Sequence, residues 1–294
     1  MRETPQGVFV NPPVPAVRPA WLKVRAPSGE KVEKVAEALG RYGLRTVCRD
    51  ARCPNVGECW GEGTATVLIL GEKCTRGCAF CGVSKGIALP PDPYEPDRVA
   101  MAAAELGWKH IVITSVTRDD LEDGGAFQFA AVVKEIRKKT PASAVELLVP
   151  DFRGSLAALQ SVVAARPDVL AHNVETVPRL YPEVRPGAVY LRSLELLECA
   201  HALAPRIGLK SGLMVGFGER REEVVSVLED LYASGVRSVT MGQYLPPSRN
   251  HPPAREYLTI EAFSALAQDA RGIGFTRVAA GPLVRSSYKA GYST

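Results

Sequence analysis

Long apolar runs are missing from this sequence. No stretch approaches the roughly 18 apolar residues of a membrane-spanning helix, and the polar start MRETPQGVFVNPPVP lacks the apolar core of a secretory signal. Strong charge of either sign is also missing, because the formal net charge is only +4. These absences argue against membrane and nucleic-acid partners, and the mild positive balance would suit an acidic protein partner.

Dispersed cysteines are missing as well. The chain has seven, and six of them lie between Cys48 and Cys81. A disulfide framework would spread its cysteines to join distant segments, whereas clustering favours metal binding in a reducing compartment. We therefore expect a cytoplasmic metalloprotein. Neither internal repeats nor low-complexity tracts are visible, and 294 residues suffice for a substantial core.

Apolar strand-like segments alternate with helical segments of about a dozen residues from residue 65 onward. This alternation is typical of βαβ units and a parallel sheet. Six strands are fewer than the eight of a closed TIM barrel, so we predict an α/β fold, an open partial (β/α)6 barrel. The predicted strands are 65–71, 110–115, 144–150, 168–173, 209–218 and 238–246, with a last extended piece at 277–284; the helices are 97–107, 127–139, 155–165, 192–205, 221–235 and 260–274.

Three regions are expected along the chain. Residues 1–63 form an N-terminal extension, with a proline-rich surface arm up to about residue 30, a helix at 29–43 and a cysteine-containing loop. Residues 64–275 form the barrel, and residues 276–294 form a C-terminal tail that closes over the barrel mouth. Polar residues follow each predicted strand, so the site is expected at the carboxyl ends of the strands.

The stretch CTRGCAFC places Cys74, Cys78 and Cys81 in a C-x3-C-x2-C spacing directly after the first strand. Thiolates this close together can serve one metal centre, and soft thiolates select zinc, copper(I) or iron–sulfur. A structural zinc site usually needs four protein ligands, and no fourth Cys or His lies near this loop. A [4Fe–4S] cluster with three cysteine ligands would leave one iron open.

This loop, in this place, resembles that of the radical S-adenosylmethionine (SAM) superfamily. The resemblance implies that the open iron binds the amino and carboxylate groups of SAM. Phe80 fits the pattern, because members often carry an aromatic residue before the third cysteine. A structural zinc site is the alternative.

A second group, CRDARCPNVGEC, places Cys48, Cys53 and Cys59 in a C-x4-C-x5-C spacing. Taken alone, this group is compatible with a structural zinc site or a cluster loop that braces the barrel. Together the two groups are similar to the lipoyl synthase family. Further motifs that carry this resemblance are PNVGECW, TSVTRDDLEDGGA, HNVETV, LKSGLMVGFGE, GQYLPPSRNH and RSSY.

The resemblance implies a radical SAM sulfurtransferase with two [4Fe–4S] clusters. The cluster of Cys74, Cys78 and Cys81 would reduce SAM to methionine and a 5′-deoxyadenosyl radical, which abstracts hydrogen at C6 and C8 of an octanoyl-lysine. The cluster of the upstream cysteines would be sacrificed as sulfur donor. Implied partners are an octanoylated lipoyl carrier domain, of the glycine cleavage H protein or 2-oxoacid dehydrogenase E2 type, and an electron donor such as ferredoxin or flavodoxin.

The resemblance also implies that a serine of RSSY completes the second cluster. We assign this role to Ser287 by family likeness, since spacing alone leaves Ser286 open. We expect this segment to be extended, so that neighbouring side chains point to opposite sides and only one of them can be a ligand. An oxygen ligand binds iron more weakly than thiolate, which would ease iron release.

Candidate SAM contacts follow the strands. Arg192 could pair with the carboxylate, Asn173 and Glu175 could bind the ribose or the amine, and Ser115 and Thr117 could reach the methionyl end. Each has an ordinary structural alternative, such as capping a loop or facing solvent. The alternatives for the whole chain are another radical SAM enzyme with an auxiliary cluster, similar to biotin synthase, and a non-catalytic zinc scaffold.

Overall fold

An eight-stranded sheet, curved into an open barrel, forms the centre of the computed structural model, which describes residues 19–24, 26–288 and 290. The strands lie across the sheet in chain order; β1 is antiparallel to β2, and the later neighbours are all parallel. The strands are β1 Arg45–Thr46, β2 Thr66–Ile69, β3 His110–Ser115, β4 Ala144–Leu148, β5 Val169–Ala171, β6 Gly208–Val215, β7 Ser238–Gln243 and β8 Arg277–Gly281.

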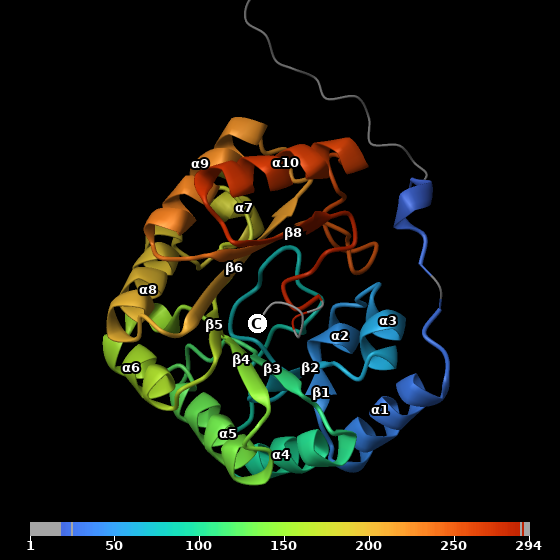
Figure 1. The fold of residues 1–294 in the computed structure, drawn as a ribbon, viewed down its shortest axis with the longest axis vertical. Coiled ribbons are helices and arrows are strands. Elements are labelled where there is room, and N and C mark those ends of the chain that lie inside the picture. The colour runs from blue at the N-terminus through green and yellow to red at the C-terminus, as the bar shows by residue number, and fades with distance from the viewer. Residues whose placement is uncertain (1–18, 25, 289, 291–294) are drawn as a thin grey trace, which may run out of the picture.

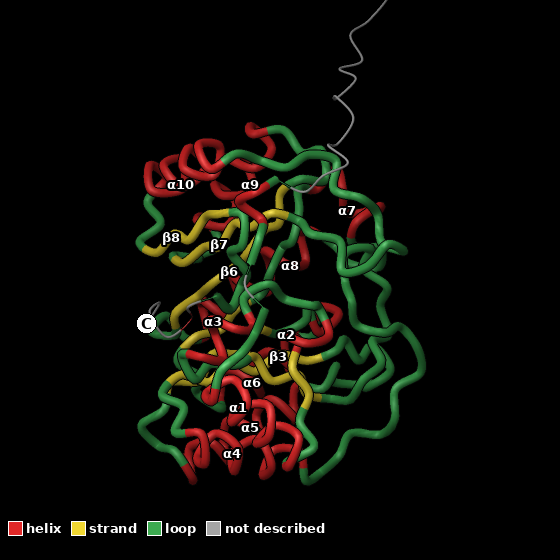
Figure 2. The backbone as a smooth tube through the Cα atoms, turned by 90° about the vertical axis from the view of Figure 1, so that its right-hand side faces the viewer, coloured by secondary structure: helices red, strands yellow, loops and turns green. Residues whose placement is uncertain are grey.

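Helices surround this sheet (Figure 1), and Figure 2 shows the same layers from the side. The helices are α1 Glu30–Arg41, α2 Val47–Asp50, α3 Val56–Gly61, α4 Glu95–Leu106, α5 Ala126–Lys139, α6 Leu156–Ala164, α7 Tyr181–Val184, α8 Tyr190–Leu203, α9 Arg221–Ala233 and α10 Ile260–Ile273, with 3-10 turns at Ala20–Leu22, Phe152–Gly154 and Pro178–Leu180. None of the helices in the described part of the chain has the length and apolarity needed to cross a membrane.

The strands are apolar because both of their faces are covered. All four residues of β2 are buried, and Val67 lies opposite Ile113 of β3. A strand buried on both faces needs a nearly continuous apolar sequence, which explains why the strands could be recognised without alternation. Helix ends follow local rules too: Gly107, at a φ of 62°, ends α4 in the left-handed conformation.

The six predicted parallel strands are confirmed as β2 to β7. The last extended piece becomes β8, which pairs in parallel with β7. The sequence did not predict β1, α2, α3 or α7, because elements of two to six residues are too short for a periodic signal. The predicted proline-rich arm falls mostly on residues 1–18 and 25, outside the described residues.

The C-terminal segment (residues 282–288) returns to the middle of the barrel after β8 (Figure 1). Gly242 of β7 allows this return, because a Cβ at Gly242 would overlap the carbonyl group of Val284. Residues 282–288 therefore lie among the loops of the barrel.

Candidate functional site: two cysteine loops and the C-terminal segment

The first cysteine loop (residues 74–81) begins a few residues beyond β2, at the carboxyl end of the strand. Backbone hydrogen bonds fold it onto the barrel: Cys74 N–H donates to Ser84 O at 2.9 Å, and Ala79 N–H donates to Val184 O at 2.9 Å. The N–H of Thr117, just past β3, donates to Cys74 Sγ at 3.3 Å. Such N–H donors to sulfur suit a thiolate that binds iron.

The three thiols of this loop are close enough to affect one another. Burial raises the pKa of Cys78, and raises that of Cys81 to about 12, with further contributions from Cys74. The N–H of Val83 opposes the shift at Cys81. Thiols that do not ionise readily on their own lose their protons when a metal binds, so this donor set fits an iron–sulfur cluster.

A buried ionic network fixes the same loop. The Arg76 guanidinium bridges Asp119, at 2.7 and 2.9 Å, and Asp151, at 2.6 and 2.9 Å. The side chains of Arg76 and Asp151 are only 8% and 0% exposed. Despite its burial, the pKa of Asp151 is lowered to about 2, because Arg76 stabilises the carboxylate. The loop is thus clamped to the segments that follow β3 and β4.

Two buried polar atoms beside this loop lack a hydrogen-bond partner within the protein. They are Ser115 Oγ, at the end of β3, and Asn173 Oδ1, just past β5, and the absence of a partner applies to the described part of the chain. Unsatisfied buried polar atoms are costly, and a polar ligand such as SAM would satisfy them. Asn173 Nδ2 already donates to Glu175 Oε1 at 3.1 Å.

An arginine that the sequence analysis missed lies beside the same loop. Arg185, one residue beyond α7, acts electrostatically on both Cys78 and Glu175. Its Nη1 donates to Asn173 O at 3.0 Å. Burial raises the pKa of Glu175, and the positive charge of Arg185 opposes this shift. No periodic pattern or motif in the sequence marked Arg185.

The remaining residues predicted to contact SAM are Arg192, Thr117 and Phe80, and each already has a contact within the protein. Arg192, in the first turn of α8, lies 3.4 Å from Asp151 and is partly engaged there. Thr117 meets the loop through its backbone, which also accepts a hydrogen bond from Thr75 N at 3.0 Å. Phe80 packs against the hydrophobic core at the edge of the loop.

The second cysteine loop (residues 48–59) lies beside the open edge of the sheet, with Cys48 in α2 and Cys59 in α3. Burial raises the pKa of Cys53, and the N–H of Asn55 opposes this shift. Cys48 and Cys53 line a hollow of about 470 Å³ against α1. Among the described residues, no group of three or more Cys, His, Asp or Glu side chains is arranged to bind a single metal ion. An iron–sulfur cluster does not need such an arrangement, because each thiolate binds a different iron atom.

The C-terminal segment packs on the second cysteine loop. Asn55 Nδ2 donates to Leu283 O at 2.6 Å, and Tyr288 Oη donates to Glu58 Oε1 and Oε2 at 3.0 and 3.1 Å. The partly buried Arg285 guanidinium acts electrostatically on Cys53, and desolvation lowers the pKa of Arg285. These contacts bring the RSSY motif to three cysteines that are more than 200 residues away in the sequence.

One premise about this segment was wrong. We expected it to be extended, but Tyr288 N–H donates to Arg285 O at 2.9 Å and closes a turn. Ser286 and Ser287 are the two central residues of this turn. The alternation rule for extended chains therefore does not separate them.

The two cysteine loops touch each other. A Cβ on Gly82, next to Cys81, would lie less than 3.0 Å from Asp50 O of α2 and 3.3 Å from Pro247 Cβ. His251, from the loop after β7, lies with its Nε2 3.1 Å from Cys81 O. The candidate site is therefore one continuous region, formed by both loops, the C-terminal segment and the loop after β7.

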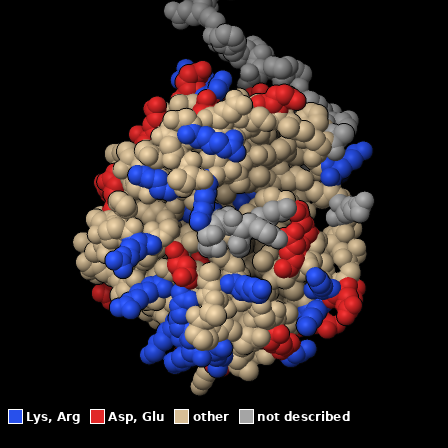
Figure 3. Space-filling view, in the orientation of Figure 1, with Lys and Arg blue, Asp and Glu red and all other residues tan. Residues whose placement is uncertain are grey.

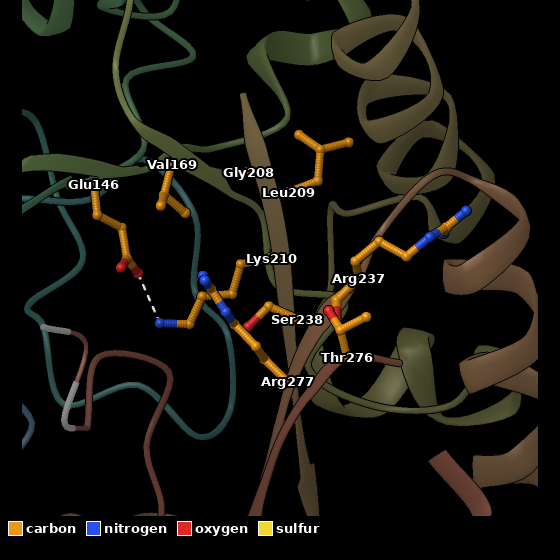
Figure 4. A pocket seen from close by; sticks show the side chains of 9 residues that line it. All are labelled: Glu146, Val169, Gly208, Leu209, Lys210, Arg237, Ser238, Thr276 and Arg277. Atoms are coloured by element: carbon orange, nitrogen blue, oxygen red, sulfur yellow. Dashed lines mark hydrogen bonds and ion pairs between the residues drawn. The ribbon is translucent and has the colours of Figure 1, made fainter. Parts of the chain in front are cut away.

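A separate small cavity of about 130 Å³ lies at the amino ends of the strands and contains no cysteine (Figure 4). There Lys210 Nζ lies 2.9 Å from Glu146 Oε1 and His110 Nε2 lies 3.1 Å from Glu146 Oε2, all with buried side chains. Figure 3 shows Lys and Arg side chains interspersed with Asp and Glu over the face of the molecule that is seen in Figure 1. We assign the buried ion pair to barrel packing.

The barrel and its first cysteine loop define the class of protein. A family model described as the Radical SAM superfamily matches residues 68–231, from β2 to α9. Solved structures agree in fold. The chain superimposes on methylornithine synthase with a TM-score of 0.56 and 15% identity, covering 85% of this chain and 78% of the other. The [FeFe]-hydrogenase maturase HydG gives 0.56 and 13%, with coverage of 85% and 63%.

Curated relatives narrow the class. Lipoyl synthase of Alkaliphilus metalliredigens is 51% identical over 93% of this chain and 94% of its own. Lipoyl synthase of Methylococcus capsulatus is 51% identical over 96% and 88%, and that of Rubrobacter xylanophilus is 51% identical over 93% and 85%. The chain belongs to the lipoyl synthase family of radical SAM enzymes.

Proposed function

We propose that this chain inserts two sulfur atoms, at C6 and C8, into an octanoyl group that is amide-linked to a lysine of a carrier protein. The observation that carries the proposal is the contact between two three-cysteine loops, with the C-terminal segment packed on one of them. When bound, SAM and a [4Fe–4S] cluster supply the radical that activates a C–H bond, and a second cluster supplies the sulfur.

The first cysteine loop would hold one cluster through Cys74, Cys78 and Cys81. The N–H groups of Thr117 and Val83 would stabilise the thiolates. Ser115, Asn173 and Glu175 would bind the polar groups of SAM, with Arg185 placed to orient the carboxylates near the loop. Phe80, Thr117 and Arg192 would border this position.

The second cysteine loop would hold the other cluster through Cys48, Cys53 and Cys59. A hydroxyl of the RSSY turn, assigned to Ser287 with Ser286 as the alternative, would complete the ligand set. The positive charge of Arg285 would stabilise the thiolate of Cys53. In this scheme the N-terminal extension (residues 1–63) carries the second cysteine loop, residues 64–275 form the radical SAM barrel, and the tail (residues 276–294) adds β8 to the same sheet and carries the RSSY motif.

The substrate would be an octanoylated lipoyl carrier domain, of the glycine cleavage H protein or 2-oxoacid dehydrogenase E2 type. A ferredoxin or flavodoxin would supply electrons, and the clustered free cysteines suit the reducing cytoplasm. The mild positive charge of the chain suits acidic partners of this kind.

Anaerobic reconstitution tests this proposal. The protein should bind about eight irons per chain and, with SAM and dithionite, convert an octanoyl-lysine peptide to the dihydrolipoyl product, detected by mass. Ser287→Ala and Ser286→Ala are compared for sulfur insertion and for SAM cleavage. Zinc without iron, or 5′-deoxyadenosine without sulfur insertion, would contradict the proposal.

A further inference from the structure

Two side-chain contacts join the second cysteine loop directly to the C-terminal segment. Asn55 is 4% exposed and donates from Nδ2 to Leu283 O at 2.6 Å, across 228 positions of sequence. Tyr288 Oη donates to the Glu58 carboxylate at 3.0 and 3.1 Å, across 230 positions. We call these two contacts the tail latch.

The tail latch brackets the serine pair. Leu283 precedes Ser286 and Ser287, and Tyr288 follows them. The turn closed by Tyr288 N–H and Arg285 O spans the residues between, so anchoring both ends fixes the position of both hydroxyls. Val284, packed on Gly242, fixes the same segment from the barrel side.

Asn55 performs separate tasks with its backbone and its side chain. Its N–H acts on the Cys53 sulfur, and its carbonyl accepts a hydrogen bond from Cys59 N at 2.8 Å. Only the side-chain amide reaches Leu283. A substitution of this side chain can therefore release the C-terminal segment and leave the backbone contacts to the cysteines in place.

We infer that Asn55 is a positioning residue, which with Glu58 and Tyr288 holds the serine pair beside Cys48, Cys53 and Cys59 whether or not a cluster is bound. This inference rests on the proposed function for the role of the serine. Bringing a weak oxygen ligand in from the chain end costs conformational entropy. Because the tail latch already holds the segment in place, this entropy cost is not incurred when the hydroxyl binds iron. The local concentration of the hydroxyl near the three cysteines stays high. The second site could then lose its cluster and receive a new one without refolding the segment.

Trypsin digestion of iron-free protein tests the latch directly, because Arg285 lies inside the segment. We expect Asn55→Ala to speed cleavage after Arg285 by at least about tenfold, since local opening limits proteolysis. Tyr288→Phe should speed it less, and Tyr94→Phe, which changes an exposed tyrosine before α4, should not speed it. Cleavage after Arg271 in α10 reports global unfolding and should not change.

Unchanged cleavage after Arg285 in Asn55→Ala would overturn the latch, whatever the serine variants do. If cleavage after Arg271 also rises in Asn55→Ala, the variant is unfolded and Tyr288→Phe decides: faster cleavage confined to Arg285 supports the latch, and unchanged cleavage overturns it. Faster cleavage at Arg285, with sulfur insertion intact in the Ser286→Ala/Ser287→Ala double variant, would keep the latch and overturn the ligand assignment.

Reconstituted protein supplies a second readout. Asn55→Ala should lose iron from the second site and keep the SAM cleavage that depends on the first. Equal iron content in the variant and the wild type would show that the amide does not position a ligand.

Discussion

The two cysteine loops are held in different ways. The first is clamped by charge, through the buried contacts of Arg76 with Asp119 and Asp151. The second is joined to the C-terminal segment by hydrogen bonds without an ion pair between them, through Asn55 and Tyr288. A rigid charged clamp suits a cluster that must return to the same state after each turnover. A closure made by a separate segment suits a site whose contents are consumed and rebuilt, as the proposed function requires.

The largest expected effect separates the two loops by function. Cys78→Ala should reduce both SAM cleavage and sulfur insertion to background. Cys53→Ala should abolish sulfur insertion and spare SAM cleavage. Chromatography of 5′-deoxyadenosine and mass analysis of the peptide check both results. Loss of SAM cleavage in Cys53→Ala, with iron retained at the first site, would contradict the division of labour.

The free energy of unfolding should depend on the ion pairs of Arg76 with Asp119 and Asp151, which we call the clamp of the first cysteine loop. Arg76→Ala leaves the carboxylate of Asp151 buried without its main partner, so the free energy of unfolding should fall by about 3–5 kcal/mol. Urea unfolding of the iron-free protein measures this change.

The matched control is Arg221→Ala, which removes an exposed bidentate pair with Asp269. That loss should be about 1 kcal/mol or less. Similar losses in the two variants would mean that the clamp is no stronger than a surface pair.

Much of the barrel could be predicted from the sequence, because strands buried on both faces produce apolar runs that are visible without context. The cysteine loops were found because metal ligands need fixed spacings. The clamp and the latch were not found. The partners of Arg76 lie 43 and 75 positions away, and Asn55 meets Leu283 across 228 positions. Local patterns carry no information about such pairs.

The turn at Ser286 and Ser287 shows the same limit. The RSSY motif contains no Gly, Pro, Asn or Asp, and its two serines favour turns only weakly, so the local turn signal was weak. The contacts of Leu283 and Tyr288 with the second loop fix the two ends of the segment, and tertiary structure thereby sets a local conformation.

The free energy of unfolding should depend on pH through a buried histidine near the first cysteine loop. His172 lies fully buried, with Nδ1 2.8 Å from Val149 O and Nε2 2.9 Å from Ser193 Oγ. Burial lowers its pKa to about 4, against about 6.5 in the unfolded chain. The unfolded state thus binds more protons between these values, so stability should fall as the pH drops from about 6.5 to about 4, by on the order of 3 kcal/mol.

Urea unfolding of iron-free His172→Gln, at pH 7 and pH 4.5, measures this contribution. The variant should lose less stability between the two pH values than the wild type does. The exposed His201→Gln in α8 serves as the control and should follow the wild type. An equal pH response in His172→Gln and the wild type would show that His172 contributes nothing to it.

The contact between the two cysteine loops at Gly82 can be disturbed by adding one methyl group. Gly82→Ala would push against Asp50 O, a backbone atom that cannot turn aside. Sulfur insertion should slow by about 10- to 100-fold, because small displacements of reacting groups are costly, while SAM cleavage should change less. Gly86→Ala is the control, since among the described residues its Cβ would meet only the flexible Lys73 side chain, at 3.4 Å. Equal slowing in both variants would argue against a specific role for the contact.

The smallest effect concerns the seventh cysteine, which belongs to neither loop. Cys199 lies in α8, partly buried against the core and free of any disulfide. Cys199→Ala removes one sulfur from a partly buried position, so the free energy of unfolding should fall by no more than about 1 kcal/mol. Iron per chain and sulfur insertion should both stay at wild-type levels, because the two loops already contain six thiols. Loss of iron in this variant would mean that a thiol outside the two loops takes part in cluster binding, and the division of the site into two three-cysteine loops would then have to be redrawn.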